Sequence, residues 1–252
     1  MRLATFNILN GRSPADDRVD VSRLATAVKS LDADVLALQE VDRNQPRSEY
    51  ADLTAIAADA MGAVEHRFVA ALSGSPGATW MAATGDEQPD SAAYGIALLS
   101  RHPVSSWQVI RLPAVPVKVP MRFHGSLRPV WVRDEPRVAV AADIAAPHGP
   151  LTVVCTHLSF LRFWNGRQLR GLVRALETHT RPLLLAGDLN MGPEPAHRIT
   201  GMRPLAAGST FPADRPREQI DHVLADGPVR AASSYVAELP LSDHRALVVD
   251  LA

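Results

Sequence analysis

The chain has 252 residues, of which 46% are hydrophobic, and a formal net charge of −1. This length allows one large domain or two small ones. Because Cys155 is the single cysteine, an intramolecular disulfide is excluded, and a reducing, cytoplasmic setting is expected. The apolar run at the N-terminus is too short for a signal peptide. No apolar stretch approaches the roughly 18 residues of a membrane-spanning helix.

Nine short apolar runs, each bounded by turn or polar residues, are typical of β-strands. They lie at residues 2–8, 33–39, 66–72, 94–100, 137–144, 151–157, 182–188, 219–225 and 245–251. Two long stretches between them, 73–92 and 111–136, are rich in Gly, Ser, Ala or Pro, and loops of this length are usually functional or mobile. Strands on both sides of these stretches are needed to complete one core, so we expect a single domain over residues 1–252.

Two helices are expected in the first quarter of the chain. Apolar residues repeat with a period of about 3.6 from Val21 to Leu31, and Asp20 is placed to cap the N-terminus of that helix. Ser48 can cap a second helix in "EYADLTAIAADAM", and Gly62 can end it.

A third helix is expected after residue 165. Asn165 and Gln168 have the spacing of a capping box, and a stripe of Leu and Val follows. The segment just before it, "HLSFLRFWNGR", is unusually apolar. Its large residues either cover the helix as ordinary core or form an exposed rim able to touch lipid or stack on a base; they are Phe160, Leu161, Phe163 and Trp164.

The order of these elements restricts the fold. Many strands with few helices exclude a helix bundle, and the irregular alternation excludes a barrel of eight βα units. Two sheets packed face to face, with helices outside, is the α+β arrangement that fits the pattern.

Charge is unevenly distributed along the chain. Residues 13–90 contain 14 acidic and 6 basic residues, whereas residues 101–137 contain 7 basic and 2 acidic, and residues 162–181 contain 5 basic and 1 acidic. The later segments could form a positive patch suited to an anionic substrate. The alternative is a compositional bias toward arginine, since the chain has only two lysines.

Polar residues recur at the ends of otherwise apolar runs. In "LLLAGDLN", for example, Asp188 and Asn190 end a strand, although burying an unpaired polar group costs roughly 1–3 kcal/mol. Each such residue alone could simply close a turn or cap a helix. Their recurrence predicts a functional site, because a rigid sheet holds side chains at its strand ends while loops leave room for a ligand. The other members of this set are Asn7, Glu40, His157, Asp221, Asp243 and His244.

The residue types favour one kind of chemistry. Glu40 and Asp243 are hard oxygen ligands suited to Mg²⁺ or Mn²⁺, and there is no His/Cys cluster with zinc spacing. His157 and His244 can serve as hydrogen-bond donors or as a general base near neutral pH. No side-chain nucleophile stands out, and Cys155 is expected to be core. Metal-assisted hydrolysis by an activated water fits these residues best.

Seven motifs carry a family resemblance when taken together and in order. They span residues 3 to 251 and read "TFNILNG", "LALQEVD", "YGIALLSR", "CTHL", "LLAGDLN", "QIDHVL" and "LSDHRALVVDL". The set resembles the endonuclease/exonuclease/phosphatase superfamily, which includes pancreatic deoxyribonuclease, exonuclease III-like abasic-site endonucleases, inositol polyphosphate 5-phosphatases and bacterial sphingomyelinases. The resemblance implies a four-layer αββα sandwich of two packed, mixed but mostly antiparallel sheets, and divalent-metal-dependent hydrolysis of phosphoesters.

The resemblance also implies roles for the residues that match the family motifs. Glu40 would bind the metal, with Asp243 as a second ligand and Asn7 supporting the site. Asp188 and Asn190 would position the attacking water and the phosphate.

Four further roles follow from the same resemblance. His157 would donate to a phosphate oxygen. His244, paired with Asp221, would act as a base or as a donor in the transition state. Arg137, in "DEPRVAVAADI", matches the arginine that contacts phosphate, and Tyr94 matches the mid-chain tyrosine of the family.

Three functions remain open at the level of sequence. A nuclease acting on DNA or RNA predicts a basic groove. A phosphatase or phosphodiesterase would act on a small molecule or a lipid headgroup. A catalytically silent binding protein would have lost at least one site residue, whereas all the expected residues are present. No long basic loop of the kind that abasic-site endonucleases insert into a duplex is identifiable.

Overall fold

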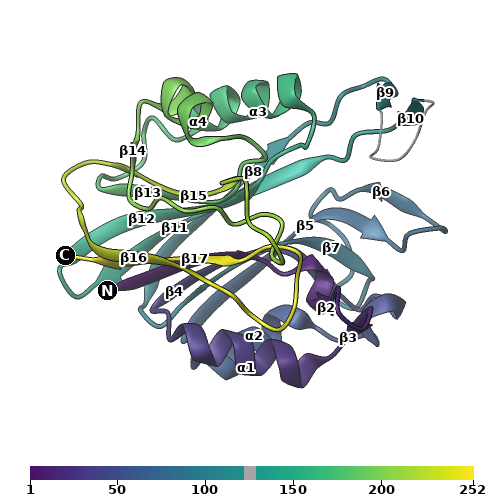
Figure 1. The fold of residues 1–252 in the computed structure, drawn as a ribbon, viewed down its shortest axis with the longest axis horizontal. Helices are drawn as coiled ribbons and strands as arrows, with labels where there is room; N and C mark the ends of the chain where they lie inside the picture. The colour runs from purple at the N-terminus through teal and green to yellow at the C-terminus, as the bar shows by residue number, and fades with distance from the viewer. Residues whose placement is uncertain (122–128) are drawn as a thin grey trace.

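The computed structural model describes residues 1–121 and 129–252, and two large β-sheets form its centre (Figure 1). The first sheet consists, from edge to edge, of β16 (Ala231–Ala237), β17 (Ala246–Leu251), β1 (Arg2–Asn7), β4 (Val35–Arg43), β7 (Ala93–Ser100), β5 (Glu65–Gly74) and β6 (Trp80–Ala82). The second consists of β14 (Arg203–Pro204), β15 (Asp221–Asp226), β13 (Leu183–Asp188), β12 (Gly149–His157), β11 (Arg137–Ala146) and β8 (Val104–Leu112). Two short hairpins pair β2 (Arg12–Ser13) with β3 (Arg18–Val19) and β9 (Val119–Met121) with β10 (Val130–Val132).

Helices cover the outer face of each sheet. Helices α1 (Val21–Leu31) and α2 (Leu53–Met61) pack on the seven-stranded sheet, and α3 (Arg162–Ala175) and α4 (Pro193–Thr200) pack on the six-stranded sheet (Figure 1). Two 3-10 turns, η1 (Leu9–Gly11) and η2 (Pro46–Ser48), follow β1 and β4. The described chain therefore has the expected four layers, and no helix in it is both long and apolar enough to cross a membrane.

Both sheets are mixed but mostly antiparallel, as expected. Strands β1 and β4 run parallel, as do β12 and β13, and the remaining neighbours in the two sheets run antiparallel. In a parallel pair the carboxyl ends of both strands meet at one edge of the sheet. In the first sheet this places Asn7 opposite Gln39, next to Glu40, and in the second sheet it places His157 opposite Asp188.

The continuous apolar runs follow from burial on both faces of the central strands. In β4, Val35 and Ala37 point into the core between the sheets, whereas Leu36 and Leu38 pack under α1 and α2. The side chains of a strand alternate between faces, so a strand covered on both sides is apolar at successive positions. All nine predicted strands are present in the structure.

One of the two expected N-caps in the first quarter is wrong. Asp20 caps α1 as predicted, and Gly62 ends α2 with φ +69°. Ser48, however, closes the 3-10 turn η2, and the next residue, Glu49, has φ +56°, so no helix begins there. Asp52 caps α2 instead, because its carboxylate accepts hydrogen bonds from the first free amides of that helix.

The predicted capping box is also wrong. Helix α3 begins at Arg162, so Asn165 and Gln168 lie inside it. Asn165 Nδ2 donates to the backbone carbonyl of Asn190 at 2.7 Å, and the side-chain oxygen of Gln168, Oε1, accepts from the backbone amide of Ser159 at 2.8 Å. Both side chains satisfy backbone groups of the loops beside the site rather than the end of their own helix.

The edge strands β8 and β16 and the short helix α4 were not predicted from the sequence. In β8 and β16 most residues are at least partly exposed, so neither reads as an apolar run. Helix α4 has only eight residues and two prolines. The stretch 73–92 contains β6, and the stretch 111–136 contains β9 and β10 as well as residues that lie outside the described part of the chain.

Candidate active site

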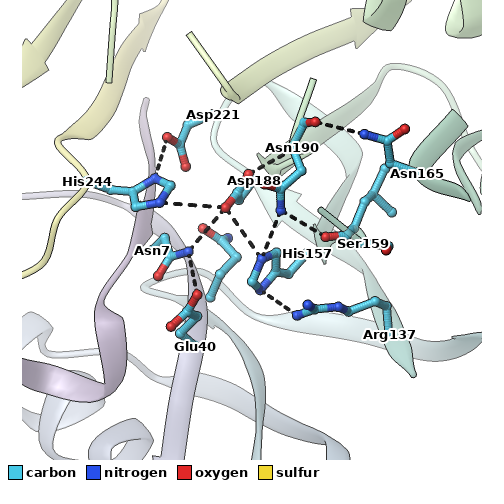
Figure 2. Close-up of polar contacts among 12 residues, drawn as sticks. Asn7, Glu40, Arg137, His157, Ser159, Asn165, Asp188, Asn190, Asp221 and His244 are labelled. Carbon is cyan, nitrogen blue, oxygen red and sulfur yellow. Dashed lines mark hydrogen bonds and ion pairs between the residues drawn. The ribbon is translucent and has the colours of Figure 1, made fainter. Parts of the chain in front are cut away.

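Strand ends from both sheets bring the predicted polar residues together (Figure 2). Asn7 ends β1, His157 ends β12, Asp188 ends β13, and Asp221 begins β15. His244 lies just before β17. These residues are buried although they are polar, so their partners must be found among one another.

Glu40 reaches the site through an irregularity in β4. The register of β4 against β7 shifts between Gln39 and Val41, and Glu40 itself has φ +56°. A bulge of this kind turns one side chain away from the regular alternation, at a cost of about 1–3 kcal/mol for the strained backbone. The strain is consistent with a functional demand for the Glu40 carboxylate at this position.

Asn7 joins the two sheets. Its Nδ2 donates to Glu40 Oε1 and to Asp188 Oδ2, both at 3.1 Å, and its Oδ1 accepts from the Leu9 amide at 3.1 Å (Figure 2). A single carboxamide therefore fixes one carboxylate from each sheet. Its own orientation is fixed by the backbone.

Asp188 and Asn190 form a rigid pair. The Asn190 amide donates to Asp188 Oδ1 at 2.9 Å, and Asn190 has φ +51°, a left-handed conformation that asparagine tolerates better than most residues. Asn190 Nδ2 also donates to the carbonyl of Leu158 at 3.0 Å. These hydrogen bonds offset the free-energy cost of burying the two polar side chains at the end of a strand.

His157 is held as a neutral imidazole. Arg137 Nη1 donates to His157 Nδ1 at 3.2 Å, which leaves the proton on Nε2, 3.4 Å from Asp188 Oδ2. Burial, together with the charges of Arg137 and His244, keeps the pKa of His157 well below its usual value. At neutral pH, His157 is therefore a hydrogen-bond donor at Nε2 and not a cation.

His244 is in the opposite state. Its Nδ1 lies 2.9 Å from Asp221 Oδ2, the pairing that the family resemblance implies, and its Nε2 lies 3.8 Å from Asp188 Oδ2 (Figure 2). Burial opposes the charged imidazolium, but the charge and hydrogen bond of Asp221 outweigh burial and raise the pKa of His244 to about 10. His244 is therefore protonated at neutral pH.

The carboxyl groups of Asp188 and Glu40 are harder to ionise in this site than in water. Burial raises the pKa of Asp188, and the nearby charge of Asp221 raises it further. Burial likewise raises the pKa of Glu40, although the hydrogen bond from Asn7 opposes that shift. Such shifts are typical of groups arranged for chemistry or for binding a cation.

A cavity of about 360 Å³ is lined by Glu40, His157, Asp188, Asn190 and His244, whereas Asn7 and Asp221 bind lining residues without lining it themselves. Besides the predicted residues, its lining includes Glu135, Phe160, Phe211 and Ile220. The predicted aromatic rim is divided: Phe160 lines this cavity and Phe163 is 96% exposed. Leu161 precedes α3 as its N-cap, and the half-buried Trp164 donates from its ring to the carbonyl of Pro113 at 2.7 Å.

Of the three remaining predicted residues, Arg137 and Tyr94 line the cavity, whereas Asp243 does not. Arg137 lines the cavity and is almost fully buried, with Glu135 at 3.5 Å. Tyr94 also lines it, and burial raises the pKa of its phenol well above the usual value, so the phenol keeps its proton. Asp243 is half-buried and lines a neighbouring groove, although its charge raises the pKa of Glu40.

The donor set fits a hard divalent cation. Glu40 and Asp243 oppose each other electrostatically, and Mg²⁺ or Mn²⁺ would relieve that repulsion through the carboxylate oxygens such ions prefer. Asp188, Asp221 and His244 also place ligand atoms within 4.8 Å of one another. That trio is a poorer metal site, because Asp221 Oδ2 is already bound by His244 Nδ1 and by Thr210 Oγ1.

The comparisons with known proteins agree with the geometry. Residues 4–244 match the Endonuclease/Exonuclease/phosphatase family. The chain belongs to this family. Family members are hydrolases acting on phosphate esters, and they generally use divalent metals.

Solved structures of similar fold cover the whole chain. An endonuclease/exonuclease/phosphatase from Beutenbergia cavernae shares 24% identity over 100% of this chain and 71% of its own, with a TM-score of 0.70. A second from Bacteroides vulgatus shares 21% over 100% and 98%, with a TM-score of 0.69. A mannosyl-6-phosphatase of Bacteroides thetaiotaomicron shares 14% over 100% and 99%, with a TM-score of 0.65. At these identities the likeness shows the fold alone, and no curated protein sequence matches the chain.

Sequence reasoning missed several residues that support the family site. Thr210 Oγ1 donates to Asp221 Oδ2 at 2.5 Å, and the ring of Phe211 lies 4.9 Å from that of His244. Ser242 Oγ donates to the Asn7 carbonyl at 2.6 Å and accepts from the His244 amide at 3.0 Å. None of these residues interrupts an apolar run, so periodicity offered no signal for them.

The glycine of the "GDLN" motif is required by close packing of β13 on β12. Gly187 has φ +147°, and a Cβ added there would lie 1.9 Å from the Thr156 carbonyl oxygen. We expect Gly187→Ala to lower the free energy of unfolding by at least about 1–3 kcal/mol, the typical cost of backbone strain alone. Chemical denaturation measures this, with Gly171→Ala as the control, since nothing lies within 4 Å of a Cβ added in that exposed part of α3. Equal stability of the two variants would contradict the expectation.

Proposed function

We propose that the chain is a phosphoester hydrolase that depends on Mg²⁺ or Mn²⁺ and uses an activated water. The observation that carries this is the convergence of two histidines on one carboxylate at the wall of a cavity: His157 Nε2 lies 3.4 Å and His244 Nε2 lies 3.8 Å from Asp188 Oδ2. The directions of the pKa shifts agree with this arrangement, because the pKa of His157 is lowered and those of His244 and Asp188 are raised. No serine, cysteine or threonine nucleophile lines this cavity in the described residues.

Glu40 would hold the metal, with Asp243 as a second ligand and Asn7 orienting the Glu40 carboxylate. The bound ion would neutralise charge on the phosphate and polarise it toward attack. The strained backbone at Glu40 and the raised pKa of its carboxyl both support this assignment, since a nearby cation would remove the cost of ionisation.

Asp188 would orient the attacking water and accept its proton. A buried carboxylate with a raised pKa is a stronger base than an exposed one, and the backbone of Asn190 fixes one of its oxygens. The Asn190 carboxamide would contact the phosphate. Its Nδ2 lies 3.3 Å from His157 Nε2, and since both atoms carry hydrogens, the two side chains present donors to the same space.

His157 and His244 would each donate to a non-bridging or leaving oxygen. His157 donates from Nε2, because Arg137 occupies Nδ1, and His244 donates from Nε2 as an imidazolium, because Asp221 occupies Nδ1. Of the two roles that the resemblance implies for His244, its raised pKa favours the donor over the base. Arg137 and Tyr94 would add contacts to the phosphate, since a guanidinium matches phosphate geometry with paired donors.

The test is a substrate panel with Mg²⁺ or Mn²⁺. It contains plasmid DNA, RNA, bis-p-nitrophenyl phosphate, inositol phosphates and sphingomyelin, so that nuclease, small-molecule and lipid activities are separated. We expect hydrolysis of at least one phosphoester that vanishes with EDTA and returns with either metal. Asp188→Asn serves as the inactive control. Activity that survives thorough chelation, or a silent enzyme on the whole panel, would overturn the proposal.

A further inference from the structure

A second cavity adjoins the catalytic one on the side of α3 and α4. It has a volume of about 550 Å³ and lies between these two helices, which run side by side over the six-stranded sheet (Figure 1). Asn190 and Ile220 line both cavities. A substrate with its reacting phosphate beside Asn190 can therefore extend directly into the groove between α3 and α4.

The groove between α3 and α4 contains two arginines that no carboxylate neutralises. Arg162 and Arg170 line it, and within residues 1–121 and 129–252 neither has a carboxylate oxygen within 4.0 Å. Arg198, the third arginine of the lining, is already paired with Glu194 at 2.7 Å. Glu218 is the acidic residue in the lining, so the unpaired arginines exceed the acidic charge.

Local packing keeps this groove open beside Arg170, which also lines the cavity on the other side of α3. Arg170 Nη1 donates to the Gly166 carbonyl at 3.3 Å, one turn earlier on α3. A Cβ at Gly166 would lie 3.4 Å from the Ile199 side chain and 3.8 Å from Arg170 Nη1, so the glycine leaves free the space between the helices. Phe163 stands at the rim with 96% of its surface exposed.

We propose that the groove between α3 and α4 is a subsite for a second phosphate of the substrate, bound by Arg162 and Arg170. The inference rests on the proposed function and narrows it to phosphoesters that carry a further phosphate beyond the one hydrolysed. Guanidinium groups bind phosphate through paired hydrogen bonds, and two unpaired ones at the border of a phosphate-cleaving cavity provide both charge and geometry. The second phosphate could belong to an oligonucleotide or to a bisphosphorylated small molecule.

The experiment compares matched substrates that differ by one phosphate. One pair is a dinucleoside monophosphate and its terminally phosphorylated form, and the other is inositol 1-phosphate and inositol 1,4-bisphosphate. For the wild-type protein we expect a lower KM for the two-phosphate member of whichever pair is hydrolysed. Arg170→Gln should raise that KM about tenfold, the scale of one charge-assisted contact, and leave the KM of the one-phosphate member unchanged.

Arg174→Gln is the matched control, because it removes the same charge from the same helix outside this groove. The inference is overturned if Arg170→Gln affects both members of a pair equally, if it has no effect, or if Arg174→Gln has the same effect. Arg162→Gln should reproduce the selective rise in KM, and Arg170→Lys should restore part of it.

Binding separates the failure of this inference from the failure of the proposed function. If no substrate is hydrolysed, calorimetry in EDTA measures binding of the phosphorylated dinucleotide and of inositol 1,4-bisphosphate to wild type and Arg170→Gln. Binding by wild type that is about tenfold weaker in Arg170→Gln supports the subsite without any turnover. Absence of binding, or equal binding by both proteins, contradicts it.

Discussion

Glu40→Gln is expected to reduce turnover by more than about 100-fold and to abolish stabilisation by Mg²⁺. Loss of a residue that only supports a metal ligand typically costs 10–100-fold, so loss of the ligand itself should cost more. Glutamine keeps the shape of the side chain and can still accept the hydrogen bond from Asn7. The change therefore isolates the negative charge.

Without metal, Glu40→Gln should not destabilise the protein, although it lowers turnover and abolishes stabilisation by Mg²⁺. Burial raises the pKa of Glu40 above its unfolded value, so ionised Glu40 destabilises the fold as the pH rises through the folded pKa. At pH 7 without metal, Glu40→Gln should be at least as stable as wild type. With Mg²⁺ at 100 times its Kd, wild type should gain about 2.7 kcal/mol and the variant should gain none.

Thermal denaturation with and without Mg²⁺ measures both effects, and calorimetry gives the metal affinity. Glu65→Gln is the matched control, because Glu65 starts β5 opposite Ser100, at the end of the sheet away from the site. Wild-type turnover and an undiminished response to Mg²⁺ in Glu40→Gln would remove Glu40 from the metal site.

Asp221→Asn is expected to lower turnover by about 10²–10⁴-fold, the usual contribution of a positioned proton donor or acceptor. Asp221 Oδ2 accepts hydrogen bonds from His244 Nδ1 and from Thr210 Oγ1, and Asp221 does not line the cavity. Its charge keeps His244 protonated and its hydrogen bond fixes the ring. Asparagine removes the charge at nearly constant volume.

The protonation state of His244 provides an independent readout. In the metal-free wild type, an NMR titration should place the pKa of His244 near 10, so the imidazolium persists through neutral pH and is lost as the pH rises through that value. In Asp221→Asn the pKa of His244 should fall, because burial lowers it and only the charges of Asp188 and Asp243 then remain to raise it. Asp226→Asn, on the same strand but in an exposed pair with Arg181, is the control. An unchanged His244 titration in Asp221→Asn would contradict the pairing.

The central strands and the residue types of the candidate site were predictable from the amino-acid pattern alone. Strands such as β4 and β13 are covered on both faces, so burial imposes an unbroken apolar run that is visible without coordinates. Polar residues that end these runs stand out for the same reason, which is how Asp188 and His157 were identified. The caps at Asp20 and Gly62 were predictable because they depend on local backbone geometry.

Features that depend on a partner distant in the chain were not predictable, because only the folded chain brings the two partners together. Edge strands β8 and β16 are held by pairing with a neighbour, not by their own pattern. Asn165 has the spacing of a helix cap, yet it bonds Asn190 because the loop carbonyl there has to be satisfied. Asn7 and Asp188 lie 181 positions apart, and only the packing of two sheets brings them to 3.1 Å. Their contact costs chain entropy that local sequence cannot offset, so it exists only when the core between the sheets has formed.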